Sequence, residues 1–250
     1  MSKIFDALRK AETEPRIEPR TRTITPELSR PAREGILSRR FPERMNRELA
    51  TLRNSIEMVV PRSNKVIAFV AAIRGEGSST LAAAYSRFVA TEFGSRVLLL
   101  DADLTGEGER LSGAGFDAEP GFLQIIADGL PLLRGIRAIE GGGFHFLPSG
   151  GKSLQTLQVF SSDRTRDLLR ELCGAYDVTV IDSAPVTLYP EVPVLLTQAD
   201  GVVLVVQSER TRREAAQRAM NRLAGAGCNV LGAVMNRRRN IVPGFLYKRV

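Results

Sequence analysis

The sequence predicts one α/β domain built on a doubly wound, mostly parallel sheet, with a flexible N-terminal extension. Three observations favour this fold class. Between residues 60 and 240, short apolar runs alternate with segments of helical periodicity. The runs are nearly all apolar, which is typical of parallel strands covered on both faces. A glycine-containing turn follows the first run, as in sheets that bind ligands at the carboxyl ends of their strands.

The predicted elements follow one another from residue 45 to about residue 240. Apolar residues at helical spacing from Met45 to Val60 predict a first helix, which Pro61 ends. We expect strands at residues 66–71, 97–100, 144–147, 178–181, 202–206 and 231–235. We expect further helices at residues 80–93, 122–127, 164–175 and 211–226. Residues 45–240 are therefore predicted to form the domain, and residues 241–250 a basic C-terminal tail.

Two segments are predicted to precede the domain. Residues 1–12 place apolar side chains on one stripe, which predicts an amphipathic N-terminal helix. Residues 13–44 contain five prolines among charged residues and few large apolar groups, so we expect a flexible linker. Such a helix can dock on a partner or on a membrane surface, and a frayed terminus is the alternative.

The composition favours a cytoplasmic globular protein. Apolar residues make up 43% of the chain and charged residues 25%. No run approaches the roughly 18 apolar residues that a membrane helix needs, and the N-terminus lacks the apolar core of a signal peptide. Cys173 and Cys228 share no metal-type or redox-type spacing, so we interpret them as buried structural thiols.

The net charge of +7 is concentrated near the two ends of the chain. Basic ends can bind nucleic acid, an anionic membrane surface or an acidic partner, or can be merely solvated. Nothing in the sequence resembles a helix-turn-helix, and the basic residues lack aromatic neighbours for base stacking. Nucleic acid is therefore the least favoured partner, and peripheral membrane contact stays open.

The turn after the first predicted strand has the setting of a P-loop, between a strand and a helix. Glycines there let backbone N–H groups point at a phosphate, and the helix end adds positive potential. Ser79 would be the hydroxyl ligand of Mg²⁺, so ATP and Mg²⁺ are the expected cofactors. An ordinary glycine turn is the alternative. The nucleotide-binding residues that we expect in this turn are Arg74, Gly75, Glu76, Gly77, Ser78, Ser79 and Thr80.

Two positions depart from the pattern G-x-x-x-x-G-K-[ST]. Ala72 replaces the first glycine, and Ser78 replaces the lysine. The lysine bridges the β- and γ-phosphates, and loss of one such donor typically lowers a rate by about 10²–10³-fold. Backbone N–H groups would still favour residual nucleotide binding, and Arg74 or Arg110 is a candidate substitute for the lost charge.

Acidic residues stand at the carboxyl ends of two later strands. Asp101 and Asp103 follow the strand at 97–100 and are the predicted catalytic carboxylates. Asp182 follows the strand at 178–181 in a Walker B pattern. The predicted Mg²⁺ ligands are therefore Ser79, Asp101 and Asp182. Asn236, after the last strand, is predicted to contact the nucleotide base, with a role as a turn former as the alternative.

Taken together, these motifs resemble the bacterial tyrosine-kinase family of capsular and exopolysaccharide biosynthesis, which are P-loop relatives of the partition and septum-site ATPases. The resemblance implies a cytosolic ATP-dependent autokinase that works with a membrane chain-length (co-polymerase) protein. It also implies that Ser79, Asp101, Asp103 and Asp182 handle Mg·ATP and the tyrosine hydroxyl. The matching segments are residues 1–12, 52–56, 74–80, 101–104, 147–150, 176–178, 181–185 and 230–237.

Four departures from the family pattern concern function. They are Ser78 for the lysine, Thr105 for a basic residue, Arg47 and Ala50 for two residues of a subunit-packing motif that keeps only Arg53, and a single Tyr247 for the C-terminal tyrosine cluster. The sequence therefore favours a degenerate member that acts as a regulatory or assembly partner in polysaccharide export, with self-association possible. Two alternatives stay open: an active tyrosine autokinase that uses an arginine in place of the lysine, and a partition-type ATPase.

Overall fold

The computed structural model describes residues 36–37, 41–105, 111, 120–139, 141 and 143–237. The predicted N-terminal helix at 1–12, most of the linker at 13–44, and the basic tail at 241–250 lie outside these residues. Arg110 and Tyr247 also lie outside them. The domain boundaries expected from the sequence therefore stay predictions.

One seven-stranded sheet organises the chain, in the order β3-β4-β2-β5-β1-β6-β7. The short strand β3 is antiparallel to β4, and all the other pairs are parallel. The strands are β1 (Lys65–Ala71), β2 (Val97–Asp101), β3 (Arg137–Ala138), β4 (His145–Leu147), β5 (Val178–Ser183), β6 (Gly201–Gln207) and β7 (Val230–Asn236). This arrangement confirms the predicted fold class and all six predicted strands, whereas β3 was not predicted.

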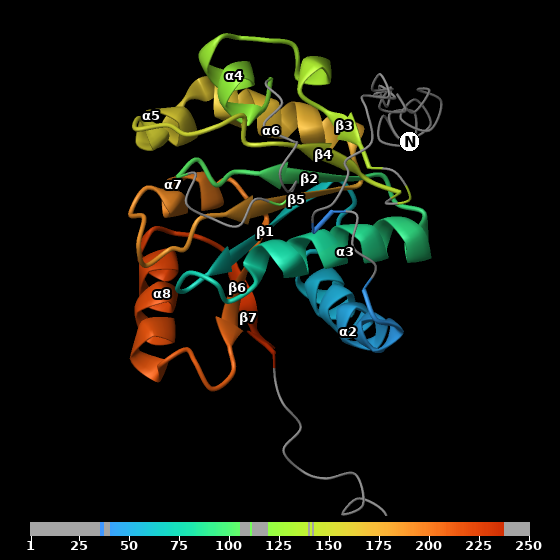
Figure 1. Ribbon diagram of the computed structural model, residues 1–250, viewed down its shortest axis with the longest axis vertical. Coiled ribbons are helices and arrows are strands. Elements are labelled where there is room, and N and C mark those ends of the chain that lie inside the picture. Colours follow the sequence, from blue (N-terminus) through green and yellow to red (C-terminus); the bar gives the residue numbers. More distant parts are fainter. Residues whose placement is uncertain are drawn as a thin grey trace, which may run out of the picture.

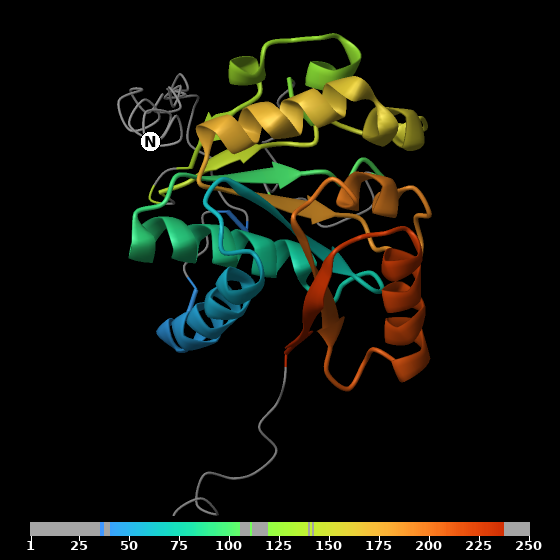
Figure 2. The same ribbon diagram turned by 180° about the vertical axis from the view of Figure 1, so that it is seen from behind.

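Helices cover both faces of the sheet, and α3 and α6 lie on opposite sides of β2 and β5 (Figures 1 and 2). The helices are α2 (Glu43–Val59), α3 (Ser78–Phe93), α4 (Phe122–Ala127), α5 (Thr156–Ser161), α6 (Asp163–Ala175), α7 (Val192–Leu196) and α8 (Arg213–Gly225), with a 3₁₀ turn, η1 (Leu132–Arg134). Five of these helices confirm predictions, and the short helices α5 and α7 were not predicted. None of the described helices has the length and hydrophobicity needed to cross a bilayer.

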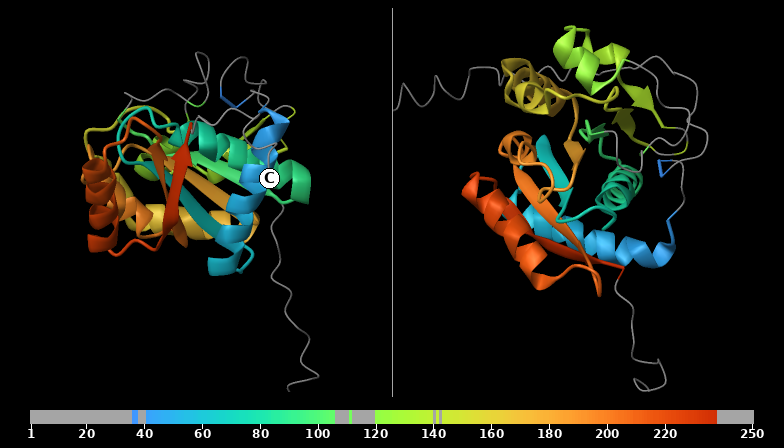
Figure 3. Two further views of the ribbon diagram at one scale, coloured as in Figure 1. Left: turned by 90° about the horizontal axis from the view of Figure 1, so that it is seen from below. Right: turned by 60° about the vertical axis from the view of Figure 1, so that its left-hand side comes forward.

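Alternate residues of the strands face two separate parts of the core. Ala68 and Val70 of β1 pack with the helices from α4 to α8, whereas Ile67 and Phe69 pack with α2 and α3. All four side chains are fully buried, as expected for a central parallel strand. At the edge of the sheet, β7 runs between α8 and α2 (Figure 3, left).

A buried ion pair ties α2 to the first residue of β1. The Lys65 side chain is almost fully buried, and its Nζ lies 2.5 Å from Glu57 Oε2 and 3.0 Å from the Val60 carbonyl oxygen. Arg53 lies 3.6 Å from the same carboxylate, and its guanidinium carbon lies 3.8 Å from the centre of the Phe93 ring. The arginine that survives from the family's packing motif therefore contacts its own chain here.

Loss of the Glu57 carboxylate should destabilise the domain, because the Lys65 ammonium would stay buried without its partner. We expect Glu57→Ala to lower the free energy of unfolding by roughly 2–3 kcal/mol, measured by urea denaturation. Glu48→Ala, at an exposed position of the same helix, should change it little. Equal losses in the two variants would contradict this assignment.

Candidate functional site

The turn between β1 and α3 has the backbone of a phosphate-binding loop. Gly75 and Gly77 have φ angles of 83° and 90°, in the left-handed region that favours glycine. Gly77 caps α3, which begins at Ser78. The first N–H groups of that helix have no intrahelical partners, and with the helix dipole they form a favourable environment for an anion.

A buried carboxylate holds the loop in this shape. Glu76 is fully buried. Its Oε2 accepts a hydrogen bond from the Ile73 N–H at 2.8 Å, and its Oε1 accepts one from the Thr211 hydroxyl. The side chain of Glu76 therefore stabilises the shape of the loop. A contact between Glu76 and a nucleotide stays a prediction. Sequence reasoning missed Thr211, which carries no motif of its own.

Asn236 joins the end of β7 to the same loop. Its Nδ2 donates to the Glu76 carbonyl oxygen at 2.8 Å, and its Oδ1 accepts from the Arg237 N–H at 2.8 Å. A Cβ atom at Gly77 would lie 2.4 Å from this Nδ2, so the close approach requires glycine. The structure thus places Asn236 at the loop, as expected, and shows it as a brace; its contact with a nucleotide base stays a prediction.

Ser78, Ser79 and Thr80 form the first turn of α3. At the position of the family lysine, the Ser78 side chain is short, neutral and buried. Arg74, one of the two candidate substitutes, donates from Nη2 to the Tyr189 hydroxyl at 2.8 Å. Its guanidinium is therefore held by the segment that follows β5.

The sheet brings the predicted carboxylates to the same edge as the loop. Asp101 and Asp182 are opposite each other in the parallel pairing of β2 and β5, and Asp182 is opposite Phe69 of β1. The Asp103 N–H donates to Asp101 Oδ1 at 3.0 Å, and Thr105 donates from its N–H and its hydroxyl to Asp103 Oδ1. Where the family has a basic residue, this chain therefore has a neutral side chain bound to Asp103.

Asp182 is an acid of the site whose pKa is strongly perturbed. It is 2% exposed, and its Oδ1 has no hydrogen-bond partner among the residues that the structure describes. Burial raises its pKa well above the ordinary value, and the negative charge of Asp101 raises it further. A hydrogen bond from Ser79 acts in the opposite direction. A buried carboxylate oxygen without a partner is typical of a site that awaits an ion or a ligand.

The side chains at this edge of the sheet carry the types of ligand atom that Mg²⁺ prefers. Ser79, Asp101 and Asp182 offer hydroxyl and carboxylate oxygens, which this ion prefers. Among the residues that the structure describes, no three or more His, Cys, Asp or Glu side chains are grouped closely enough to hold a metal ion. A bound Mg²⁺ would therefore take further oxygen ligands from water and from nucleotide phosphates.

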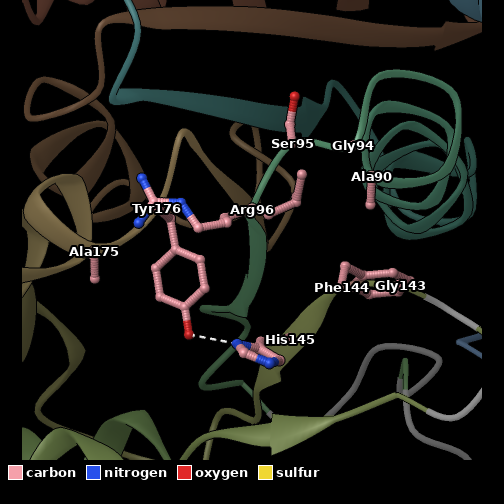
Figure 4. A pocket seen from close by; sticks show the side chains of 10 residues that line it. Ala90, Gly94, Ser95, Arg96, Gly143, Phe144, His145, Ala175 and Tyr176 are labelled. Atoms are coloured by element: carbon pink, nitrogen blue, oxygen red, sulfur yellow. Dashed lines mark hydrogen bonds between the residues drawn. The ribbon is translucent and has the colours of Figure 1, made fainter. Parts of the chain in front are cut away.

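A separate pocket of about 310 Å³ lies at the opposite, amino-terminal edge of the sheet (Figure 4). In it, His145 Nδ1 and the Tyr176 hydroxyl are hydrogen-bonded at 2.7 Å, with the rings edge to face. Burial lowers the pKa of His145, which favours the neutral imidazole. A neutral, half-buried imidazole bonded to a tyrosine hydroxyl is typical of a structural histidine. The pocket contains none of the predicted site residues.

Comparison with known sequences gives several bacterial relatives, although no protein-family model matches the chain. Tyrosine-protein kinase YwqD of Bacillus subtilis is 31% identical over 205 residues, which cover 81% of this chain and 85% of YwqD. The putative tyrosine-protein kinase EpsB of Ralstonia nicotianae is 27% identical over 203 residues, 80% of this chain and 27% of EpsB. The succinoglycan biosynthesis transport protein ExoP of Rhizobium meliloti is 26% identical over 186 residues, 72% of this chain and 23% of ExoP.

Solved structures show the same fold. The kinase domain of Escherichia coli tyrosine kinase ETK matches with a TM-score of 0.72 at 20% identity, over 97% of this chain and 91% of that domain. The BceF tyrosine kinase domain matches with a TM-score of 0.69 at 25% identity, over 93% and 87%. The Pyrococcus furiosus cell division ATPase MinD matches with a TM-score of 0.56 at 21% identity, over 73% and 77%.

The sheet order, the phosphate loop and these matches define a P-loop nucleotide-binding fold, which the cell division ATPase MinD shares. The identity of 31% with YwqD, over 81% of this chain, allows the family to be assigned. The chain belongs to the bacterial tyrosine-kinase family, which confirms the resemblance seen in the sequence. It spans about a quarter of the longer relatives EpsB and ExoP.

The raised pKa of Asp182 has a consequence for stability. Because this pKa is higher in the folded than in the unfolded chain, the carboxyl contributes stability at acidic pH that is lost as the pH rises through the folded-state value. Asp182→Asn removes the ionisation and keeps the shape. We therefore expect its melting temperature at neutral pH to exceed that of the wild type by a few degrees, and the difference to shrink toward the ordinary pKa of aspartate.

The measurement is thermal unfolding of both proteins over a series of pH values. Asp128→Asn, at an exposed carboxyl after α4, serves as the control for loss of one negative charge. Parallel pH profiles for the wild type and Asp182→Asn would show that this group is not the source of the dependence.

Proposed function

We propose that this chain is a catalytically impaired member of its family that acts as a regulatory or assembly partner of a membrane chain-length protein in exopolysaccharide or capsule export. The observation that carries the proposal is the combination of an intact phosphate loop with Ser78 at the lysine position. The loop keeps its two left-handed glycines and its helix start. Its fixed positive charge is lost.

The electrostatics of the site support impaired phosphoryl transfer. Asp101, Asp103 and Asp182 lie at the carboxyl edge of the sheet, while Ser78 and Thr105 replace two basic residues of the family pattern. Transfer of a phosphoryl group depends on positive charge at the oxygens that bear the developing negative charge. Loss of the lysine alone is expected to cost about 10²–10³ in rate.

The expected biological setting rests on the relatives. One relative is named a succinoglycan biosynthesis transport protein, and several are named tyrosine-protein kinases. We place this chain in the cytoplasm, at the inner face of the membrane, with a chain-length protein as its partner. Arg53, the one residue left of the family's packing motif, is engaged with Glu57 and Phe93 of its own chain. This contact supports a partner role that does not depend on packing of identical subunits through this motif.

Restoring the lysine provides the test of impairment. We expect the wild type to incorporate no γ-labelled phosphate in the presence of Mg²⁺, and Ser78→Lys to bind Mg·ATP at least about tenfold more tightly, because one charge-assisted contact is restored. Calorimetry measures the binding, and labelling measures the transfer. Ser78→Ala, which removes the hydroxyl without adding charge, serves as the matched control. Labelling of the wild type or of a partner tyrosine would instead establish the active-kinase alternative.

The partner role predicts a cellular phenotype that does not depend on transfer. Deletion of the chain should change the amount or length of the exported polysaccharide, and both the wild type and Asp103→Asn should restore it, since neither needs to transfer phosphate. Polymer size distribution is the measurement, together with co-purification of the chain with the membrane chain-length protein. An unchanged polymer after deletion would refute the proposed setting. Salt-dependent binding to DNA would favour the partition-type ATPase instead.

A further inference from the structure

An arginine from a distant turn lies directly on the phosphate loop. Arg210, in the turn between β6 and α8, places its Nη1 3.3 Å from the Gly75 carbonyl oxygen. The same nitrogen lies 3.0 Å from the position that a Cβ atom on Gly75 would occupy. The guanidinium therefore packs against the outer side of the loop. Arg210 itself is exposed to solvent.

A second guanidinium meets the first at one amide oxygen. Gln207 Oε1 lies 3.4 Å from Nη1 of Arg210 and 3.4 Å from Nη1 of Arg237. Like charges gathered at one neutral acceptor repel each other. In the part of the chain that the structure describes, neither arginine has a carboxylate within ion-pair distance. An anion bound beside the pair would remove this repulsion.

The backbone that presents the pair adopts an unfavourable conformation on both sides. Glu209, next to Arg210, has a φ of 62°, and Arg237 has a φ of 55°. Non-glycine residues in this region are uncommon and cost free energy. Asn64 is the one other such residue in the described ranges. Unfavourable backbone of this kind gathers where a structure holds groups for binding.

Hydrogen bonds couple this backbone to the loop. The Thr211 hydroxyl accepts from the Gln207 N–H at 2.9 Å and donates to Glu76. At the other side, Asn236 accepts from the Arg237 N–H and donates to the Glu76 carbonyl oxygen. The two arginines are therefore held in place relative to the phosphate loop by the same buried glutamate.

From this geometry we propose that Arg210 and Arg237 form a clamp that binds the phosphate chain of a nucleotide at the outer rim of the loop. The proposal rests on the proposed function, and it adds that a nucleotide is bound without phosphoryl transfer. Arg74 is held by the Tyr189 hydroxyl and is not part of the clamp. Guanidinium groups suit this task because their planar fork donates two hydrogen bonds to one phosphate.

Such a clamp explains how the protein can bind a nucleotide without transferring its phosphoryl group. It supplies positive charge from the carbonyl side of the loop, where Arg210 contacts Gly75. The lysine of other P-loops instead reaches the β- and γ-phosphates from the helix start, and here that position is Ser78. A nucleotide can therefore be held by its phosphates while the transferred group lacks its cation.

Calorimetry with ADP and with adenosine, each with Mg²⁺, tests the clamp on the full chain. Loss of one charged contact predicts that Arg210→Ala and Arg237→Ala each weaken ADP binding by about ten- to hundredfold. Adenosine, which has no phosphate, should bind equally to all variants. Arg210→Lys should retain part of the ADP affinity. Arg218→Ala, at an exposed position of α8, removes the same charge and should leave ADP binding unchanged.

Unfolding curves of the same variants check that the fold is kept. The clamp is overturned if the wild type binds no ADP, if Arg210→Ala binds ADP as the wild type does, or if Arg218→Ala weakens binding equally. These outcomes differ from a failure of the proposed function. Labelling of the wild type with γ-phosphate would refute impaired catalysis, while the response of ADP binding to Arg210→Ala would still decide the clamp.

Discussion

The buried carboxylate of Glu76 is the contact on which the geometry of the site depends. It binds a backbone N–H within the loop and a hydroxyl of the turn after β6, while its own carbonyl oxygen receives the amide of Asn236. A buried carboxylate without such partners would carry a large desolvation cost. The loop is therefore held in shape by contacts within the protein in which Ser78 takes no part.

The fold could be predicted largely from local pattern. Each of the six predicted strands is a run of mostly apolar residues, because a central parallel strand is covered on both faces and needs no polar alternation. The elements that escaped prediction are short. Strand β3 has two residues and α7 has five, too few to show a period. Their structure is set by neighbours: β3 by pairing with β4, and α7 by packing on the core.

The residues of the site also fall into two groups. Local sequence predicts the position of some of them, and contacts between distant segments set the position of the others. Asp101 and Asp182 could be placed at one edge because parallel strands end together, and the structure pairs them in register. The contacts that shape the loop could not be predicted from the order and ends of the strands. Thr211 and Arg210 each contact the loop across a separation of 135 residues. Such contacts follow from β6 lying next to β1, which no local pattern in either segment reveals.

The charge balance of the site explains why binding and transfer need not be lost together. Binding depends on the total attraction of the phosphate chain to backbone N–H groups, to Mg²⁺ and to nearby cations, so one lost contact can be offset by another at a different place. Transfer depends on charge placed at the few oxygens where negative charge develops. Ser78 removes charge at that place, and the carboxylates beside it add repulsion. A chain of this family can therefore keep its loop for binding after losing its use in transfer.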